Sequence, residues 1–311
     1  MDGKQLQQQY KHHISDYKHW DQAEHATEWM LFENNIGPHL SLDETALSRD
    51  ELYTVITNKS ARGQKGALVA LVKSTQADKV CEALLKISEG RRHLVQEITL
   101  DMAASMHQIA RRCFPKARLV TDRFHVQQLA IEAVQELRIK HRWEELDKEN
   151  DAIAEAKKTK EPYIPELLSN GDSPKQLLAR SRYLLFKHKD AWTASQLHRA
   201  RLLFERYPAI EQAYKLSRKL SDIFSNCTAK IVAFKRLTLW YNEVEESGLK
   251  VFRTVAKSIE THHTSILNYF DHRSTNAAAE SFNAKIKAFR AAARGVRDIA
   301  FFLFRLANIY A

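Results

Sequence analysis

The chain has 311 residues, of which 44% are apolar, so it can bury one large core or two smaller ones. With only eight glycines and six prolines it is neither a low-complexity nor a fibrous sequence, and helix should dominate. Its formal net charge of +10 favours a polyanionic partner, most simply nucleic acid, although a basic soluble protein without that role has the same signature.

The three cysteines, Cys81, Cys113 and Cys227, lie far apart and form no metal-binding pair. We therefore expect reduced core thiols in a cytoplasmic protein. The sequence has no signal-peptide pattern and no apolar run long enough to span a bilayer, which argues against the secreted and membrane-spanning classes.

Residues 1–37 form a polar leader that is rich in histidine. No cysteine or suitable acidic residue completes a metal-ligand set around these histidines, so a metal site is not favoured there. A linker or a docking helix anchored by the aromatic residues of the leader is the expected role.

Three β-favourable runs follow from Pro38, in the order HLSLDE, LYTVITN and GALVALVK. They predict an antiparallel meander whose first strand ends at Asp43. A helix over residues 77–89 is expected next, because its apolar residues recur at helical spacing.

The segment from Glu97 to Asp122 predicts a strand, a crossover helix and a second strand. Asp101 ends the first of these strands and Asp122 ends the second. Such units are right-handed with parallel strands, so both aspartates should emerge at the carboxyl edge of the sheet. Open α/β sheets place their chemistry at that edge.

The order strand, strand, strand, helix, strand, helix, strand is that of a ribonuclease-H-like α/β core with a mixed five-stranded sheet, here over residues 38–125. The first and fourth strands are neighbours in such a sheet, which would bring Asp43 close to Asp101. No strand pattern recurs over residues 126–271, so we expect an all-helical insertion domain. Residues 272–311 should then return to the core as helices.

The segment STNAAAESFNAKIKAFRAAARG predicts a helix that carries Glu280. Ser274, Thr275 or Asn276 can cap its start. A capping box would require Ser or Thr three residues before Glu280, where Ala277 stands, so capping does not explain this glutamate well.

Asp43, Asp101 and Glu280 are the candidate metal ligands. Carboxylates suit hard divalent ions such as Mg²⁺ or Mn²⁺. Two ions about 3.5–4 Å apart can stabilise the attacking and leaving oxygens of a phosphoryl displacement, so water or a DNA 3′-hydroxyl can attack without a nucleophilic side chain. Each acid also has a structural alternative, since Asp101 can cap a helix and Glu280 can complement a helix dipole.

Three stretches, LSLDETALS, ITLDMAASM leading to FPKARLVTDRFHV, and STNAAAESFNAKIKAFRAAARG, resemble the ISL-three family of insertion-sequence DDE transposases, in detail its ISAon-type subgroup. The resemblance extends from about residue 36 onward. It implies a transposase catalytic domain that cuts and joins DNA with Mg²⁺, and transposon ends and target DNA as partners. The alternative is a non-catalytic DNA-binding or regulatory protein derived from a transposase.

Asp101 and Asp122 both qualify as the second catalytic acid. We choose Asp101, because the resemblance implies that the second acid follows the fourth strand. Related superfamilies carry a Cys or Asp, two residues and then a His after the fifth strand, and Asp122 with His125 looks like that motif. We expect these two residues to orient the metal ligands or to hold a DNA phosphate, while a core histidine is an equal alternative for His125.

Basic side chains should follow the DNA backbone without reading its sequence. Those expected near the catalytic centre or on the first inserted helix are Lys285, Lys287, Arg290, Arg294, Arg297, Arg138, Lys140 and Arg142. Joint cutting of two transposon ends implies a homodimer, and a bacterial DNA substrate implies association with the nucleoid.

The leader departs from the layout that the resemblance implies. ISL-three transposases commonly carry an N-terminal zinc-binding and helix-turn-helix region that recognises transposon ends, and this leader lacks the cysteines for it. We therefore expect a separate partner protein or a longer fused product to supply specific end recognition.

Overall fold

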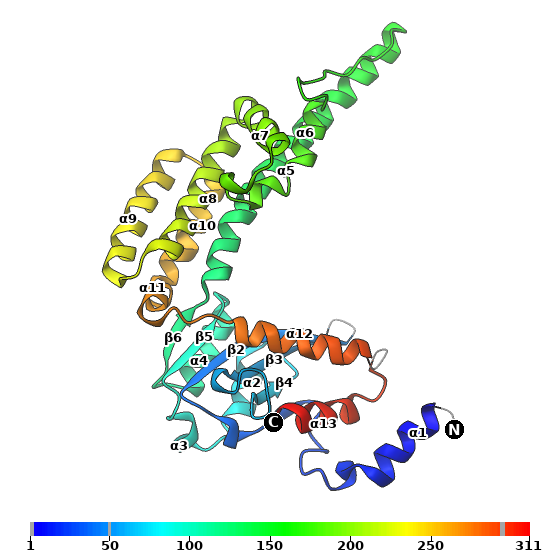
Figure 1. Ribbon diagram of the computed structural model, residues 1–311, viewed down its shortest axis with the longest axis vertical. Coiled ribbons are helices and arrows are strands. Elements are labelled where there is room, and N and C mark those ends of the chain that lie inside the picture. The colour runs from blue at the N-terminus through cyan, green and yellow to red at the C-terminus, as the bar shows by residue number, and fades with distance from the viewer. Residues whose placement is uncertain (1–2, 49–50, 293–295) are drawn as a thin grey trace. The chain divides into compact units, whose positions relative to one another are not determined.

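The computed structural model describes residues 3–48, 51–292 and 296–311 (Figure 1). Its contacts divide the chain into two compact units, which we call the core unit (Met1–Asp122 with Thr264–Ala311) and the helical unit (Arg123–His263). The chain leaves the core unit after the last strand of its sheet and returns for the last three helices. The helical unit is therefore an insertion into the core unit.

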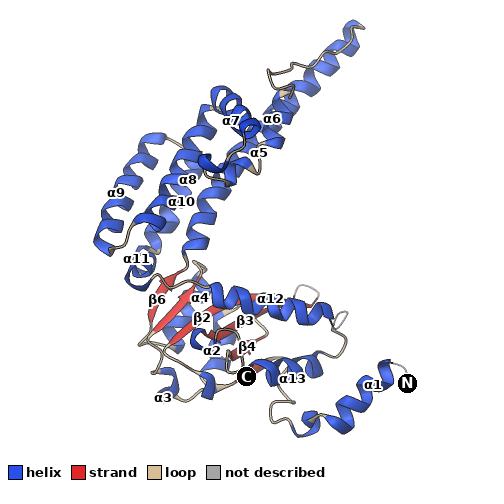
Figure 2. Cartoon of the chain, viewed as in Figure 1, coloured by secondary structure: helices blue, strands red, loops and turns tan. Residues whose placement is uncertain are grey.

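A six-stranded mixed sheet forms the centre of the core unit (Figure 2). Its strands are β1 (Trp29–Leu31), β2 (His39–Ser48), β3 (Glu51–Asn58), β4 (Leu68–Val72), β5 (Glu97–Leu100) and β6 (Arg118–Thr121). The spatial order is β1-β4-β3-β2-β5-β6. Pairing is antiparallel from β1 through β2 and parallel from β2 through β6, so the predicted meander and the predicted parallel pair are confirmed.

Two features of the sheet correct the sequence-based expectation. The sheet has six strands instead of five, because β1 in the leader pairs with β4 as an edge strand and buries Met30. The second correction concerns β2, which continues to Ser48, so Asp43 lies inside the strand and not at its end. Thr45 and Leu47, which follow Asp43 and Glu44 in the strand, are buried, so buried and more exposed side chains continue to alternate along β2.

Two helices whose apolar residues recur at helical spacing cover one face of the sheet, as the sequence predicts. Helix α2 (Ala77–Leu84) and helix α4 (Ala104–Cys113) bury apolar residues in a cluster with Leu40, Ile56 and Ile98 of the sheet. The short helix α3 (Glu89–Arg92) follows α2 in the chain. This cluster contains Cys81 and Cys113, and none of the three cysteines forms a disulfide.

On the other face, α12 (Ala277–Ala292) and α13 (Ile299–Tyr310) pack against the sheet. Phe282 and Ile286 of α12 lie in one buried cluster with Leu47 and Val55. These contacts fix how α12 is rotated, and therefore which of its polar side chains face the sheet. Ala293, which belongs to the segment that predicts this helix, lies outside the described residues.

The remaining parts of the core unit flank these layers. Helix α1 (Gly3–Gln9) opens the described part of the leader, and Trp20 packs against Phe304 of α13 with ring centroids 5.5 Å apart. Helix α11 (His263–His272) is fastened to the sheet, because Asn268 Nδ2 donates to the Leu119 carbonyl at 2.9 Å.

The helical unit, all of which the structure describes, contains no strand. Its α-helices are α5 (Arg123–Thr159), α6 (Pro174–Arg180), α7 (Ala194–Arg206), α8 (Pro208–Asn226), α9 (Lys230–Ser247) and α10 (Lys250–Thr261). Gly248, with φ of 67°, ends α9 in the left-handed conformation that glycine adopts without strain. No helix among the described residues is long and apolar enough to cross a membrane.

Candidate active site

Three aspartates align across neighbouring strands of the core unit. Strands β2, β5 and β6 pair in parallel register, and the same register continued past the ends of β5 and β6 brings Asp43, Asp101 and Asp122 into one row. The Asp122 N–H donates to the Leu100 carbonyl at 3.0 Å, so the ladder does continue to this residue. The row thus gathers carboxylates from three strands at one position of the sheet.

Helix α12 adds a fourth carboxylate to this row. Glu280 lies in its first turn, and a carboxylate oxygen of Glu280 lies within 4.8 Å of one of Asp122. Asp122 is 2% exposed, and its Oδ2 accepts the Asn276 N–H at 3.1 Å. The start of α12 therefore orients Asp122 and places an exposed acid next to it.

His125 is half-buried in the first turn of α5, three residues after Asp122. An imidazole can bind a divalent ion, so the role of His125 stays a prediction from the sequence motif.

Asp43 is held from α12 as well. Asn283 Nδ2 donates to Asp43 Oδ2 at 2.8 Å and to the Glu44 carbonyl at 3.2 Å. Asn283 is 7% exposed, and its Oδ1 has no hydrogen-bond partner among the residues that the structure describes. A buried amide oxygen beside a carboxylate is an oxygen ligand of the kind that Mg²⁺ binds.

Asp101 makes a hydrogen bond that fits its structural alternative, the capping of a helix. Its Oδ1 accepts the Ala103 N–H at 2.8 Å, just before α4 begins. Burial and then the negative charges of Asp101 and Asp43 raise the pKa of Glu44, so the Glu44 carboxylate lies close enough to both aspartates to be repelled by them. A bound cation would relieve that repulsion.

The predicted set of Asp43, Asp101 and Glu280 does not converge within 4.8 Å in the described part of the chain. Glu280 meets Asp122 instead, while Asn283, one turn further along α12, meets Asp43. The row therefore offers two neighbouring groups of donors, one at Asp122 and Glu280 and one at Asp43 and Asp101.

A buried ionic network lies beside Asp122. Glu97 accepts the Ser274 hydroxyl, lies 2.8 Å from Arg118 Nη2 and lies 3.9 Å from Lys59 Nζ. Burial lowers the pKa of Lys59, while the charges of Glu97 and Asp122 oppose that shift. Lys59 comes from the basic turn NKSARGQKG, which looks like a solvated loop in the sequence, so no local pattern marks it as part of the site.

The basic residues predicted on the C-terminal segment differ in their surroundings. Lys285 donates to the Gly63 carbonyl at 2.7 Å and so holds the turn between β3 and β4. Lys287 and Arg297 are exposed, and Arg290 is partly buried. Arg294 lies outside the described residues.

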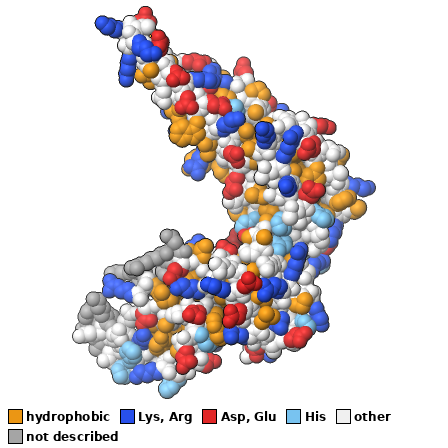
Figure 3. Space-filling model, turned by 180° about the vertical axis from the view of Figure 1, so that it is seen from behind, with side chains coloured by type: hydrophobic (Ala, Val, Ile, Leu, Met, Phe, Trp, Pro, Cys, Tyr) orange, Lys and Arg blue, Asp and Glu red, His pale blue; other side chains and the backbone are white. Residues whose placement is uncertain are grey.

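Arg138 belongs to the interior of the helical unit. Its guanidinium donates to Gln135 Oε1 at 2.7 Å and to the Leu178 carbonyl at 3.0 Å, and burial lowers its pKa. We therefore leave Arg138 out of the proposed DNA surface. Lys140 and Arg142 are exposed, and on the face shown in Figure 3 basic side chains alternate with acidic ones.

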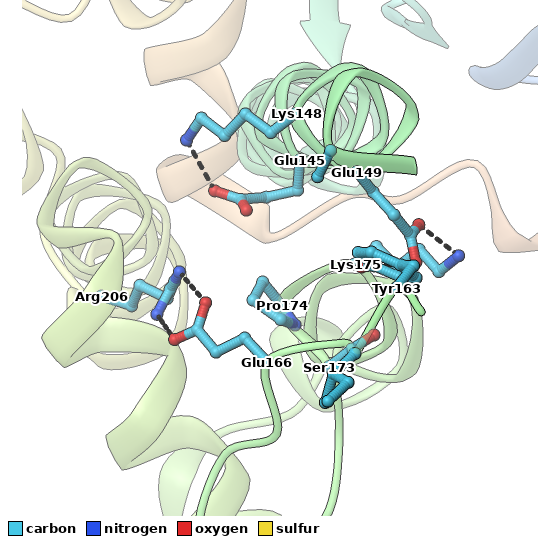
Figure 4. A pocket seen from close by; sticks show the side chains of 11 residues that line it. Glu145, Lys148, Glu149, Tyr163, Glu166, Ser173, Pro174, Lys175 and Arg206 are labelled. Carbon is cyan, nitrogen blue, oxygen red and sulfur yellow. Dashed lines mark hydrogen bonds and ion pairs between the residues drawn. The ribbon is translucent and has the colours of Figure 1, made fainter. Parts of the chain in front are cut away.

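The helical unit also contains a cavity of about 300 Å³ lined by charged side chains (Figure 4). Three ion pairs occupy its wall, Glu145 with Lys148 at 3.0 Å, Glu166 with Arg206 at 2.7 Å, and Glu149 with Lys175. Because these charges satisfy one another, the cavity has no net charge with which to select a ligand, and we assign it no role.

The chain belongs to the ISL3 family of DDE transposases. The family model, described as Transposase, matches residues 40–306, which is most of the chain, so the expected resemblance to the ISL-three family is confirmed at the level of the family. The transposase for insertion sequence element IS1001 of Bordetella parapertussis is 21% identical over 271 residues, which are 86% of this chain. The chain spans 60% of the length of that curated relative. No solved structure matches the chain.

Proposed function

We propose that this protein is the catalytic part of an insertion-sequence DNA transposase, which cuts DNA at transposon ends and joins it to a target with two divalent ions. The proposal rests on one observation: the carboxylates of Asp122 and Glu280 lie close together, next to the aligned Asp43 and Asp101. The strand order β4-β3-β2-β5-β6 supports a ribonuclease-H-like core, the fold expected from the sequence.

The ligand atoms in the row fit Mg²⁺ or Mn²⁺, because they are carboxylate oxygens with a buried amide oxygen nearby. Two such ions stabilise the attacking and leaving oxygens of a phosphoryl displacement when they are bound. Asp122 and Glu280 would hold one ion, with His125 supporting Asp122, and Asp43 and Asp101 would hold the other.

Other residues of the chain would keep these acids in place. Asn283 orients Asp43 through its amide N–H, and Asn276 orients Asp122 through its backbone N–H. Lys59 offsets part of the negative charge around Asp122 before metal binds.

DNA is the proposed substrate. The exposed side chains of Lys287 and Arg297 in the core unit, and of Arg142 in the helical unit, would neutralise phosphates, which makes binding weaker at higher salt. A homodimer and a separate protein for end recognition, both expected from the sequence, belong to the same proposal.

Metal-dependent cleavage of a pre-nicked transposon-end duplex tests this function, with the end-recognition protein added if it is required. We expect Glu280→Gln to reduce cleavage by at least about a hundredfold, because a metal carboxylate contributes several kcal/mol to the transition state. Glu280 is exposed, so the substitution should leave the fold intact.

Glu82→Gln is the control for that experiment, since Glu82 is an exposed glutamate of α2, on the opposite face of the sheet. Its cleavage rate should equal that of the wild type. A wild-type chain that binds DNA but shows no carboxylate-dependent Mn²⁺ binding by calorimetry would instead be the non-catalytic relative.

Asn283→Ala should weaken Mn²⁺ binding by about tenfold, because partners that orient a metal ligand typically contribute about 10- to 100-fold to affinity. Calorimetry on the folded variant measures this. Asn268→Ala removes a matched amide donor from the same unit, one that donates to the Leu119 carbonyl, and should leave Mn²⁺ affinity unchanged. Equal Mn²⁺ affinity for both variants would leave Asn283 with a packing role only.

A further inference from the structure

The helical unit contains a buried arginine whose hydrogen-bond acceptors are neutral. Arg138 of α5 is 6% exposed, and its guanidinium donates to Gln135 Oε1 at 2.7 Å and to the Leu178 carbonyl at 3.0 Å. An amide oxygen and a carbonyl oxygen satisfy the N–H groups but carry no charge. The positive charge of Arg138 is therefore buried without an opposite charge to offset it, which is costly.

Two exposed arginines lie beside Arg138. Arg142 follows it one turn later on α5, at the i, i+4 spacing that places two side chains on the same face of a helix. Arg182, in the turn after α6, is held close through a shared neighbour, because Gln135 Nε2 donates to the Arg182 carbonyl at 3.2 Å. We call Arg138, Arg142 and Arg182 the arginine cluster.

The arginine cluster has no counter-charge of its own. Burial lowers the pKa of Arg138, and the like charges of Arg182 and Arg142 lower it further. None of the three forms an ion pair among the residues that the structure describes, whereas Lys140 on the same helix pairs with Glu144 at 3.9 Å. Like charges this close repel one another, so an anion that binds here would relieve the repulsion.

An exposed aromatic ring adjoins the arginine cluster. The guanidinium carbon of Arg182 lies over the Tyr183 ring, 5.4 Å from its centroid, and Tyr183 is 70% exposed. A guanidinium on one face of a ring leaves the other face able to take a planar group. Basic side chains next to an exposed aromatic ring are the combination with which many proteins hold single-stranded nucleic acid, because every base has a face that can stack.

We propose that the arginine cluster and Tyr183 form a binding site for single-stranded DNA, in which Arg142 and Arg182 contact backbone phosphates and a neighbouring base stacks on the Tyr183 ring. Arg138 touches no phosphate in this arrangement, and its buried charge strengthens the attraction. Acidic peptide side chains match the charge as well but offer no planar group for the ring, so DNA is the better occupant. The inference rests on the proposed DNA substrate and adds an unpaired strand as the form that the helical unit holds.

Fluorescence anisotropy of a labelled oligothymidylate, with the full chain and in EDTA so that no cleavage occurs, tests this inference. Arg182→Ala should weaken binding about tenfold and should reduce the slope of log affinity against log salt by about 0.7, the value for one phosphate contact on a single strand. Arg236→Ala is the matched control, because Arg236 is an exposed arginine of α9 in the same unit, and it should bind like the wild type.

Tyr183 distinguishes a single strand from a duplex. Tyr183→Ala should weaken oligothymidylate binding about tenfold and leave the affinity for a duplex of equal length unchanged, because paired bases are not free to stack on the ring. Tyr183→Trp should keep the wild-type affinity, since stacking needs a ring and not the hydroxyl group. Phe234→Ala removes an aromatic side chain of α9 that is 49% exposed, and this control should have no effect.

Arg182 and Tyr183 are exposed, so these substitutions should leave the fold intact, which thermal melting checks. The proposal is overturned by a wild type that does not bind oligothymidylate, by an Arg182→Ala variant no weaker than Arg236→Ala, or by a Tyr183→Ala variant that keeps full affinity or loses duplex affinity equally. A chain that binds as expected but does not cleave DNA would contradict only the proposed function.

Discussion

Asp122→Asn is expected to abolish metal-dependent cleavage and to leave one bound Mn²⁺ where the wild type binds two. Asp122 is buried, and Glu280 meets its carboxylate. The asparagine keeps an oxygen that can accept the Asn276 N–H, so the local fold should survive while the negative charge is lost. Loss of one ion of a two-ion site should slow cleavage by about a thousandfold or more.

Asp101→Asn provides the comparison, because the sequence interpretation makes Asp101 the second catalytic acid and Asp122 a supporting residue. With one ion at each pair of acids, Asp101→Asn also loses cleavage and also retains one Mn²⁺. Calorimetric stoichiometry and cleavage are measured after thermal melting shows that both variants are folded. An Asp122→Asn protein that binds two Mn²⁺ and cleaves partially would refute the arrangement and favour the sequence-based choice.

Local patterns were sufficient to predict most of the sheet. Runs of β-favourable residues marked β2, β3 and β4, and the strand-helix-strand pattern marked β5 and β6, so the placement of Asp101 and Asp122 at neighbouring strand ends followed from the sequence. Strand β1 was missed because three residues are too few to show a period, and its partner β4 is distant in the sequence.

Local sequence patterns could not predict which of the site residues lie close together. Phe282 and Ile286 predict a buried side for α12, but how far α12 is shifted along the sheet depends on packing against the whole layer. That shift decides whether Glu280 meets Asp122 or the pair of Asp43 and Asp101. The position of Lys59 likewise depends on where the turn after β3 folds back.

Glu97→Gln is expected to lower the free energy of unfolding at neutral pH by about 3 kcal/mol, because removal of one partner from a buried ion pair strands the other charge. The Glu97 side chain is 3% exposed, and it faces Arg118 and Lys59. The estimate is at the low end of the usual range, since Arg118 keeps a second partner in Asp271 at 2.9 Å. Urea unfolding followed by circular dichroism measures the loss.

Glu51→Gln is the matched control for that loss, because Glu51 pairs with Lys73 at 2.8 Å on the surface of the same sheet. A surface pair of this kind contributes under about 1 kcal/mol, so the control should remain close to the wild type. Equal losses for Glu97→Gln and Glu51→Gln would show that the buried network adds nothing beyond an ordinary surface pair.

The dependence on pH gives Glu97→Gln a second readout. Burial alone would raise the pKa of Glu97, but the hydrogen bonds from Ser274 and Arg118 and the charges of Lys59 and Arg118 outweigh it, so the pKa lies below its ordinary value. The network therefore stabilises the fold fully above the unfolded-state pKa of about 4.3, and this stability is lost as the pH falls through the folded-state pKa. The difference between wild type and Glu97→Gln should shrink below about pH 4, and a constant difference down to acid pH would mean that packing, not charge, causes the loss.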